Sequence, residues 1–319
     1  MTALEWLLES DPSIRWQAQR DLCDATAKVV EAERARVAAE GWGARLLALQ
    51  GDDGLWEGGA LFPGRDGQPL PWDRSEGQPW TATAYSLVQL QECGIDPDDD
   101  RVRRAVTLVR DNCHWENAGQ PFFEGEVEPC INGMVVSLGA SFGQDVEGVV
   151  DRLLGEQLDD GGWNCEVENG SVRGSFNTTI RVLEGLLEHE QATGGSADAR
   201  AVRRRGEEYL LERRLLWRRS TGEVIDPEFE QFSYPTRWHY DVLRGLDYFR
   251  STGAPPEARA GQAIELVRSK QQPDGRWLLE NTHKGAVHFT MDAGDGQSSR
   301  WNTLRALRVL RWYDGVPVR

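Results

Sequence analysis

The sequence predicts an all-α protein, an α/α toroid in which about five to six helical hairpins form a barrel. A motif, Gln-x-x-x-Gly-x-Trp, occurs at residues 50–56, 157–163 and 271–277. Each copy follows an amphipathic stretch and contains Asp-Gly or Asp-Gly-Gly, so it marks a turn at the end of a helix. A second set of helical stretches, less charged and richer in Gly, Ala and Ser, alternates with charged ones. Strand-forming patterns are almost absent.

Length and composition limit the class of protein. A chain of 319 residues with 39% hydrophobic residues can bury one large core or two smaller ones. The formal net charge of -16 argues against nucleic acid or an anionic membrane as a partner. The five scattered cysteines favour reduced thiols over a disulfide framework. Because the sequence shows no secretory leader and no long apolar run, we expect a cytoplasmic protein without a transmembrane segment.

We expect a single toroid domain over residues 1–319, with N-terminal helices at 1–48 and motif-bearing hairpins at 49–312. The segment Asp11-Pro12-Ser13 is a helix-start signal in the first part. Residues 51–79 are rich in Gly and Pro and predict a long loop. Loops of this length are often functional. A surface excursion packed by its tryptophans would explain the loop equally well.

The less charged helices share one register. Aligned on their apolar positions, they end at Leu90, Leu138, Leu186, Phe249 and Leu310. Their equivalent first-turn positions are Ala82, Cys130, Thr178, Asp241 and Asn302. In a ring of hairpins these helices pack inside, while the charged helices face solvent. The N-termini of the inner helices then point to one mouth, so their first turns converge on a common cavity.

The three Gln-x-x-x-Gly-x-Trp copies resemble the QW motifs of squalene-hopene cyclases and related triterpene cyclases. The segments 175–180 and 299–304 are similar to the inner-helix starts of that superfamily, which includes the protein prenyltransferase β subunits. The resemblance spans roughly residues 40–312. It implies an α/α toroid that takes a hydrophobic, isoprenoid-type small molecule into a central cavity, with the activity of a terpene cyclase, an isomerase or lyase. Since one fold can host several chemistries, the inner-helix starts decide between activities.

The register and the resemblance place a set of mostly aromatic and polar residues at the mouth of the cavity. These candidate substrate-contacting residues are Trp80, Phe176, Asn177, Thr178, Arg237, Trp238, Arg300, Trp301 and Asn302. Three hypotheses compete for what this mouth does.

In the first hypothesis the protein is a cyclase whose acid is Asp241. Protonating an alkene requires an acid in a water-excluded cavity, and aromatic faces stabilise the carbocations that follow. The family's acid motif, Asp-x-Asp-Asp-Thr-Ala, is absent, but Asp241 is in the register of its final Asp. His239 could set the protonation of Asp241, and Tyr240 would supply a ring face. The alternative is that Asp241 caps its helix by accepting backbone N–H groups.

In the second hypothesis the mouth holds zinc. Glu128 and Cys130 stand two residues apart at an inner-helix start, similar to the Asp-x-Cys zinc ligands of protein prenyltransferases. In that family a histidine on the next inner helix completes the set, and this chain has a threonine there. We therefore expect His239 as the third ligand, with Cys165 and His283 as further candidates. A thiolate, a carboxylate and an imidazole would leave the fourth zinc position open. The alternative is that Cys130 is a small buried residue beside a solvated loop.

In the third hypothesis the toroid binds a lipid or a partner protein without catalysis. Arg173, Arg237 and Arg300 lie near inner-helix starts and could together hold a diphosphate or carboxylate head group. Pairing of these arginines with neighbouring carboxylates is the alternative. A second subunit could complete the site in any of the three hypotheses.

Overall fold

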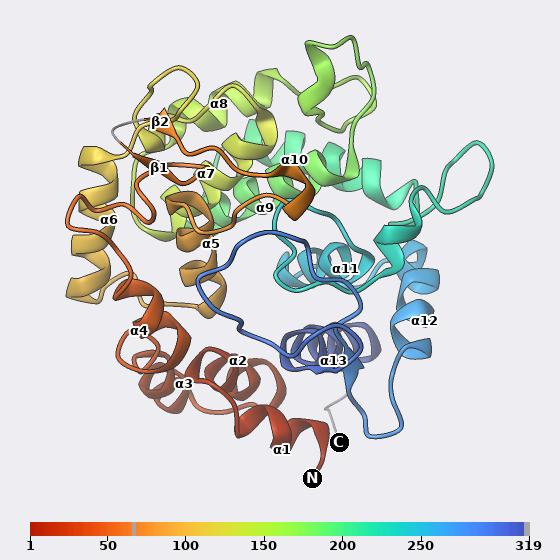
Figure 1. Cartoon of the computed structure of the whole chain (residues 1–319). Helices are drawn as coiled ribbons and strands as arrows, with labels where there is room; N and C mark the ends of the chain where they lie inside the picture. Colours follow the sequence, from red (N-terminus) through yellow and green to blue (C-terminus); the bar gives the residue numbers. More distant parts are fainter. Residues whose placement is uncertain (66–67, 316–319) are drawn as a thin grey trace. The chain divides into compact units, whose positions relative to one another are not determined.

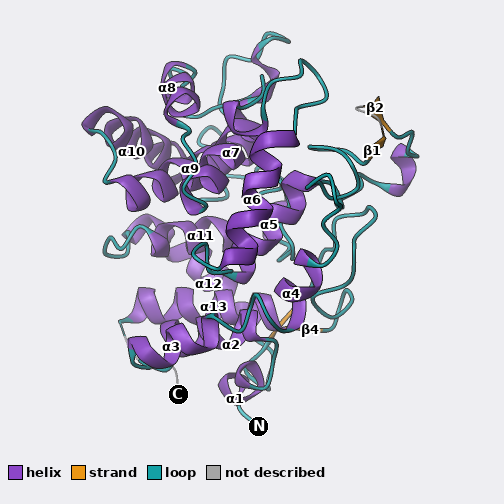
Figure 2. Cartoon of the chain, turned by 90° about the vertical axis from the view of Figure 1, so that its left-hand side faces the viewer, coloured by secondary structure: helices purple, strands orange, loops and turns teal. Residues whose placement is uncertain are grey.

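The computed structural model describes residues 1–65 and 68–315. Figure 1 follows the chain along its sequence, and Figure 2 shows that its described part consists of helices joined by loops, with a few very short strands. The all-α class predicted from the sequence is confirmed. None of the helices in the described ranges is long and apolar enough to cross a bilayer.

The chain divides into two compact units. The first contains residues 1–36, residues 208–283 and the segment that begins at Thr290, and the second contains residues 37–207 and 284–289. The chain therefore passes between the units four times. Closure of the hairpins into one ring, and a single domain over residues 1–319, stay predictions.

The N-terminal helices expected in residues 1–48 are present. They are α1 (Ala3–Leu8), α2 (Pro12–Leu22), α3 (Ala27–Arg34) and α4 (Gly41–Leu47). The predicted start signal is confirmed, because Asp11 is the N-cap of α2 and its carboxylate accepts the Ser13 N–H at 2.9 Å. The long loop that follows contains the hairpin of β1 (Gly64–Arg65) and β2 (Gln68–Pro69) and the short 3-10 helix η1 (Arg74–Glu76). Of its tryptophans, Trp56 and Trp80 are buried, whereas Trp72 is 36% exposed and stacks on Phe62.

In the second unit, largely buried helices alternate with helices that expose one face. The buried set is α5 (Thr83–Cys93), α7 (Pro129–Ser141) and α9 (Phe176–Thr193). The more exposed set is α6 (Asp100–Asn112), α8 (Glu147–Gly155) and α10 (Ala197–Leu211), and the boundary between the units falls within α10. Two further 3-10 helices, η2 (Phe122–Glu124) and η3 (Cys165–Val167), precede α7 and α9.

Helices α7 and α9 touch through their backbones. A Cβ atom on Gly133 would lie 2.7 Å from the carbonyl oxygen of Arg181, and one on Gly185 would lie 2.3 Å from the carbonyl oxygen of Gly133. Both distances are below van der Waals contact, so glycine is needed for this approach. The packing holds these two inner-type helices side by side.

The first unit is built around α13 (Arg300–Asp314), which packs against α2 and α11 (Val242–Ser251). It also contains α12 (Gly261–Ser269), the 3-10 helices η4 (Pro227–Glu230) and η5 (Ala258–Ala260), and the pair of β3 (Trp277–Leu278) with β4 (Ser298–Ser299). The predicted inner-helix ends, from Leu90 to Leu310, all lie within α5, α7, α9, α11 and α13.

Each copy of the repeated motif forms the same set of hydrogen bonds, which we call the tryptophan lock. The buried indole Nε1–H donates to the carbonyl oxygen ten residues earlier, at Leu46, Leu153 or Val267, over 2.7–2.8 Å. The tryptophan N–H donates to a threonine hydroxyl in the first turn of α5, α9 or α13, at 3.0–3.1 Å. These threonines are Thr83, Thr179 and Thr303. Each directly follows a predicted first-turn position, so the register is confirmed for three of the five helices.

The glutamine of each motif closes the turn. Its Nε2–H donates to the carbonyl oxygen of the motif glycine, at 2.7 Å for Gln50, 2.8 Å for Gln157 and 3.3 Å for Gln271. In the first two copies it also donates to a carbonyl oxygen of α6 or α10, that of Ala105 or Val202. In these two copies the motif therefore ties a helix end, an inner-type helix start and the next charged helix together.

A largely buried ion cluster joins α2, α11 and α13 in the first unit. Asp247 accepts hydrogen bonds from Arg308 Nε and Arg250 Nε, each at 2.8 Å. Arg308 also donates to Gln17 at 3.0 Å and lies 3.6 Å from Asp21. Burial alone would raise the pKa of Asp247, but the charges of Arg308 and Arg250 outweigh it and hold that pKa well below its usual range.

Thr179→Val tests the tryptophan lock, because it preserves the shape of the side chain and removes the acceptor of the Trp163 N–H. A buried N–H without an acceptor costs about 1–3 kcal/mol, and we expect the free energy of unfolding in urea to fall by that amount. The control is Thr107→Val on the exposed side of α6, which should change it by less than about 0.5 kcal/mol. Equal effects of the two substitutions would contradict the lock.

Asp247→Asn tests the ion cluster. Leaving Arg308 without its buried partner should lower the free energy of unfolding by about 3–5 kcal/mol at neutral pH. Because the folded-state pKa of Asp247 is depressed, its contribution is present above the unfolded pKa of about 3.9 and is lost as the pH falls through the lower folded pKa. Urea titrations at several pH values should show the effect of the substitution shrinking below about pH 4. A pH-independent difference would contradict this account.

Candidate functional site

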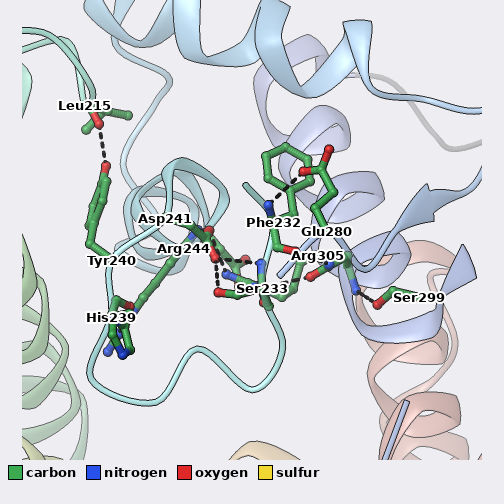
Figure 3. Close-up of polar contacts among 12 residues, drawn as sticks. Leu215, Phe232, Ser233, His239, Tyr240, Asp241, Arg244, Glu280, Ser299 and Arg305 are labelled. Carbon is green, nitrogen blue, oxygen red and sulfur yellow. Dashed lines mark hydrogen bonds and ion pairs between the residues drawn. The ribbon is translucent and has the colours of Figure 1, made fainter. Parts of the chain in front are cut away.

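The carboxylate of Asp241 is buried at the start of α11 and is occupied by hydrogen-bond donors (Figure 3). One oxygen accepts the Arg244 N–H at 2.7 Å, and the other accepts the Ser233 N–H at 3.2 Å and the Ser233 hydroxyl at 2.8 Å. Arg305 lies 3.6 Å away, and Asp241 is 1% exposed. These donors and the burial close the carboxylate off, whereas an acid catalyst must present its proton to a substrate. The geometry favours the capping alternative for Asp241.

The two residues predicted to act with Asp241 make contacts elsewhere. The Tyr240 hydroxyl donates to the carbonyl oxygen of Leu215 at 2.7 Å, away from His239 (Figure 3). Burial raises the pKa of Tyr240 well above its usual value. His239 stacks between Trp238 and His283, with ring centroids 3.6 and 3.7 Å apart. The structure therefore brings His239 to His283, a pairing that sequence spacing did not predict.

Both stacked histidines are held neutral. Burial, His283 and Arg244 lower the pKa of His239 to about 3. Burial and the charges of Arg237 and Arg244 lower the pKa of His283 to about 4. The Nε2 atom of His283 is buried and has no hydrogen-bond partner. The Arg244 guanidinium is itself tied to the loop, through the carbonyl oxygens of Arg237 and His239 at 3.3 and 2.6 Å.

Several residues of the predicted mouth have structural contacts within the first unit. Trp301 stacks on Tyr234 with ring centroids 4.4 Å apart, and Asn302 donates to two carbonyl oxygens at 3.0 and 3.2 Å. Arg300 lies over the Trp6 ring and donates to the Trp6 carbonyl oxygen. Arg237 is buried, while Trp238 is 39% exposed.

The other predicted mouth residues belong to the second unit. Trp80 donates through Nε1 to the carbonyl oxygen of Lys284 at 2.9 Å, and Phe176 and Thr178 are buried in the first turn of α9. Asn177 beside them is half-buried, and Arg173 is exposed. A cavity of about 360 Å³ lies between α4 and α6 and contains none of the predicted mouth residues among its lining side chains. The central cavity at the inner-helix starts stays a prediction.

A cluster of two thiols and a carboxylate lies at the starts of α7 and α9. The donor atoms of Glu128, Cys130 and Cys165 all lie within 4.8 Å of one another. The Cys130 thiol is 3.5 Å from a Glu128 oxygen. Glu128 is exposed and both cysteines are half-buried, so the cluster is open to small ions. The sequence prediction of Glu128 and Cys130 as partners agrees with this geometry.

The loop before α7 is held by Glu126, and its hydrogen bonds do not involve the Glu128 carboxylate. Glu128 is the N-cap residue of α7, yet its side chain makes no capping hydrogen bond. Instead Glu126 accepts the N–H groups of Val127 and Glu128 at 2.5 and 3.0 Å. Asn132 exchanges two hydrogen bonds with the Glu126 backbone, at 2.7 and 2.8 Å. These bonds fix the loop that leads into α7, and the Glu128 carboxylate contacts the Cys130 thiol instead.

Cys165 is placed by the second tryptophan lock. It stands two residues after Trp163, and the loop that carries it is closed by the Ser175 N–H, which donates to the Trp163 carbonyl oxygen at 2.8 Å. The Cys165 sulfur lies 3.5 Å from the hydroxyl of Thr178, in the first turn of α9. The thiol therefore lies beside the position from which the prenyltransferase histidine was expected.

The two thiols differ in acidity. A hydrogen bond with Cys165, together with burial, raises the pKa of the Cys130 thiol well above its usual value. The same contact lowers the pKa of the Cys165 thiol.

This donor set fits a thiophilic divalent metal such as zinc. Zinc takes thiolate and carboxylate ligands, and three protein ligands leave its fourth position open. Cys165 was one of the further candidates for the third ligand, and it is the donor that lies with Glu128 and Cys130. His239 as the third ligand stays a prediction. The sequence does contain a signal for Cys165, because it stands two residues after the last residue of the second motif. That position alone does not bring Cys165 close to Cys130. The packing of α7 on α9 does.

Comparisons with known proteins give a distant likeness. No protein-family model matches the chain, and no curated protein matches it. The chain is similar to a solved structure of a variant of the type II terpene cyclase MstE from Scytonema, in complex with its substrate geranylgeranyl dihydroxybenzoate. The identity is 14%, the TM-score is 0.41, and the match covers 97% of this chain and 93% of that chain. A likeness this distant assigns no activity to the chain.

The stacked histidines provide a test of the electrostatics. With pKa values of about 3 and about 4, both imidazoles should stay neutral from pH 8 down to about pH 5. NMR titration of the imidazole resonances, assigned through His239→Gln and His283→Gln, should show no change in that window. Because both pKa values lie below the unfolded value of about 6.5, the stability linked to them is present above that pH and declines as the pH falls towards the folded values. Titration of either resonance near pH 6.5 would contradict this account.

Proposed function

We propose that the protein is a zinc-dependent enzyme of the prenyltransferase-like kind that acts on a hydrophobic, isoprenoid-type molecule. The observation that carries the proposal is the convergence of Glu128, Cys130 and Cys165 at the starts of two inner-type helices. The substrate class draws on the resemblance of the three repeated motifs to those of the terpenoid cyclase and prenyltransferase superfamily.

Each residue of the cluster has a defined part in the proposal. Glu128, Cys130 and Cys165 hold the metal, and the Thr178 hydroxyl, 3.5 Å from the Cys165 sulfur, orients that thiolate. Glu126 holds the backbone of Glu128 in place by accepting its N–H. Bound zinc would lower the pKa of a thiol or water molecule in the open position and so supply a nucleophile.

Exposed apolar side chains on the ligand-bearing segments support a hydrophobic substrate. Val127 precedes Glu128 and is 40% exposed, and Val167 follows Cys165 by two residues and is 46% exposed. Val172, in the loop between η3 and α9, is 77% exposed. Large apolar side chains that face solvent beside reactive groups provide contact area for an apolar chain.

The charges of the same segments are mainly acidic. Three exposed acidic residues, Glu124, Glu166 and Glu168, compare with one exposed basic residue, Arg173. The nearby Arg152 is engaged by the carbonyl oxygens of Glu126 and Val127. These negative charges would repel a diphosphate bound close to the metal ligands. The segments therefore favour a substrate with an uncharged head group. An anionic head group held by Arg173, Arg237 and Arg300 was the expectation from the sequence.

The zinc proposal takes precedence over acid catalysis because of the contacts of Asp241. Its carboxylate accepts hydrogen bonds from Ser233 and Arg244 and is closed to solvent. The cluster at α7, in contrast, is open, and its ligand atoms contact mainly one another. The alternative function, binding of a lipid or a partner protein without catalysis, would also use the exposed valines. It differs from the zinc proposal because it requires no bound metal.

Metal analysis of the purified, untagged protein tests the proposal. We expect about one zinc per chain, bound through three protein ligands, and its loss in Cys130→Ala and in Cys165→Ala. Cys23→Ala removes an exposed thiol of the other unit and should retain the metal. Circular dichroism would show that the variants remain folded. Zinc content that is unchanged in both cluster variants, or no zinc in the wild-type protein after reconstitution, would overturn the proposal.

A further inference from the structure

The two thiols of the cluster also form a candidate modification site. We propose that a hydroperoxide oxidises Cys130 and Cys165 to a disulfide, and that this reaction removes two of the three metal ligands. The release of zinc rests on the proposed function. The disulfide rests on the positions of the two thiols alone.

The geometry brings the sulfur atoms within reach of each other. They belong to different segments, the first turn of α7 and the short helix η3, yet lie no more than 4.8 Å apart. A disulfide requires about 2.05 Å between the sulfurs, so they must approach by at most about 2.8 Å. Cys165 lies in a loop whose ends are joined by the bridge between Trp163 and Ser175. Its side chain can therefore adjust while the lock and α9 stay in place.

Cys130 and Cys165 are reached by solvent, and each has the other thiol as a neighbour. Cys130 and Cys165 are both half-buried, so a small oxidant can reach them. Cys93 and Cys113 are buried, and burial raises the pKa of the Cys113 thiol to about 12, which keeps it protonated and unreactive. Cys23 is exposed but belongs to the other unit.

The reaction balances in two steps. One thiolate of the pair attacks the O–O bond of the hydroperoxide, forming a sulfenic acid and releasing an alcohol, or water when the oxidant is hydrogen peroxide. The second thiolate then attacks the sulfenic sulfur, forming the S–S bond and releasing hydroxide, which takes up a proton to give water. Two electrons pass from the two thiols to the peroxide.

Oxidation changes the donor set. Thiolate sulfur binds zinc, whereas the sulfur atoms of a disulfide do not act as zinc ligands. After oxidation Glu128 is the remaining ligand of the cluster, and one carboxylate does not hold zinc against dilution. A dithiol reductant restores both thiolates by exchange and so permits zinc to bind again.

The test exposes the zinc-loaded, full-length protein to hydrogen peroxide. We expect zinc to appear in solution, measured with a chromogenic chelator, in step with the loss of two free thiols. Peptide mapping should identify the Cys130–Cys165 disulfide. Dithiothreitol and added zinc should restore the original metal content. Cys23→Ser should respond as the wild-type protein does, whereas Cys130→Ser and Cys165→Ser should form no disulfide.

The outcomes separate this inference from the proposed function. A Cys130–Cys165 disulfide formed by a protein that binds no zinc would support the thiol pair and overturn the zinc proposal. The opposite outcome is a protein that binds zinc but forms no Cys130–Cys165 disulfide after peroxide treatment. Its two cysteines could stay reduced or each become a sulfinic acid. Either result would overturn the inference and leave the zinc proposal standing. Linkage of either thiol to Cys23 instead would also overturn the inference.

Discussion

The tryptophan lock is the interaction on which the described structure depends. An indole N–H and a backbone N–H that are both buried must each find an acceptor. The lock provides them from the end of one helix and the first turn of another. The motif glutamine adds a carbonyl of the next charged helix in two copies. These hydrogen bonds fix the angle and the register between neighbouring hairpins, in addition to the apolar contacts between them. At Trp163 a further bond, from the Ser175 N–H to the Trp163 carbonyl oxygen, closes the loop that carries Cys165.

The fold class followed from the sequence because its main determinants are local. The spacing of Gln, Gly and Trp specifies a turn whose hydrogen bonds run within a few residues, and the Asp11 cap is equally local. The division into two units did not follow, since it depends on distant partners. The return of residues 284–289 to the second unit rests on bonds from Trp80 to the carbonyl oxygens of Lys284 and Ala286, at 2.9 and 2.8 Å. No periodicity marks such a contact.

The site was predicted in part for the same reason. Glu128 and Cys130 are two residues apart at one helix start, so their proximity is a local property. Cys165 joins them through the packing of Gly133 on Gly185, which sequence spacing does not encode. For Asp241 the helix position was predicted correctly, since it is the N-cap of α11. Its chemical environment was not, because Ser233 and Arg305 approach it from other segments.

The interleaved course of the chain has a practical consequence for dissecting the molecule. Since the backbone enters and leaves each unit repeatedly, neither unit corresponds to a continuous stretch of the gene. Cutting the chain between residues 207 and 208, for example, leaves residues 1–36 on the fragment that lacks α13, their packing partner in the first unit. The thiol cluster has to be studied in the intact polypeptide, and tags or fusions are better placed at its ends than at the boundaries between units.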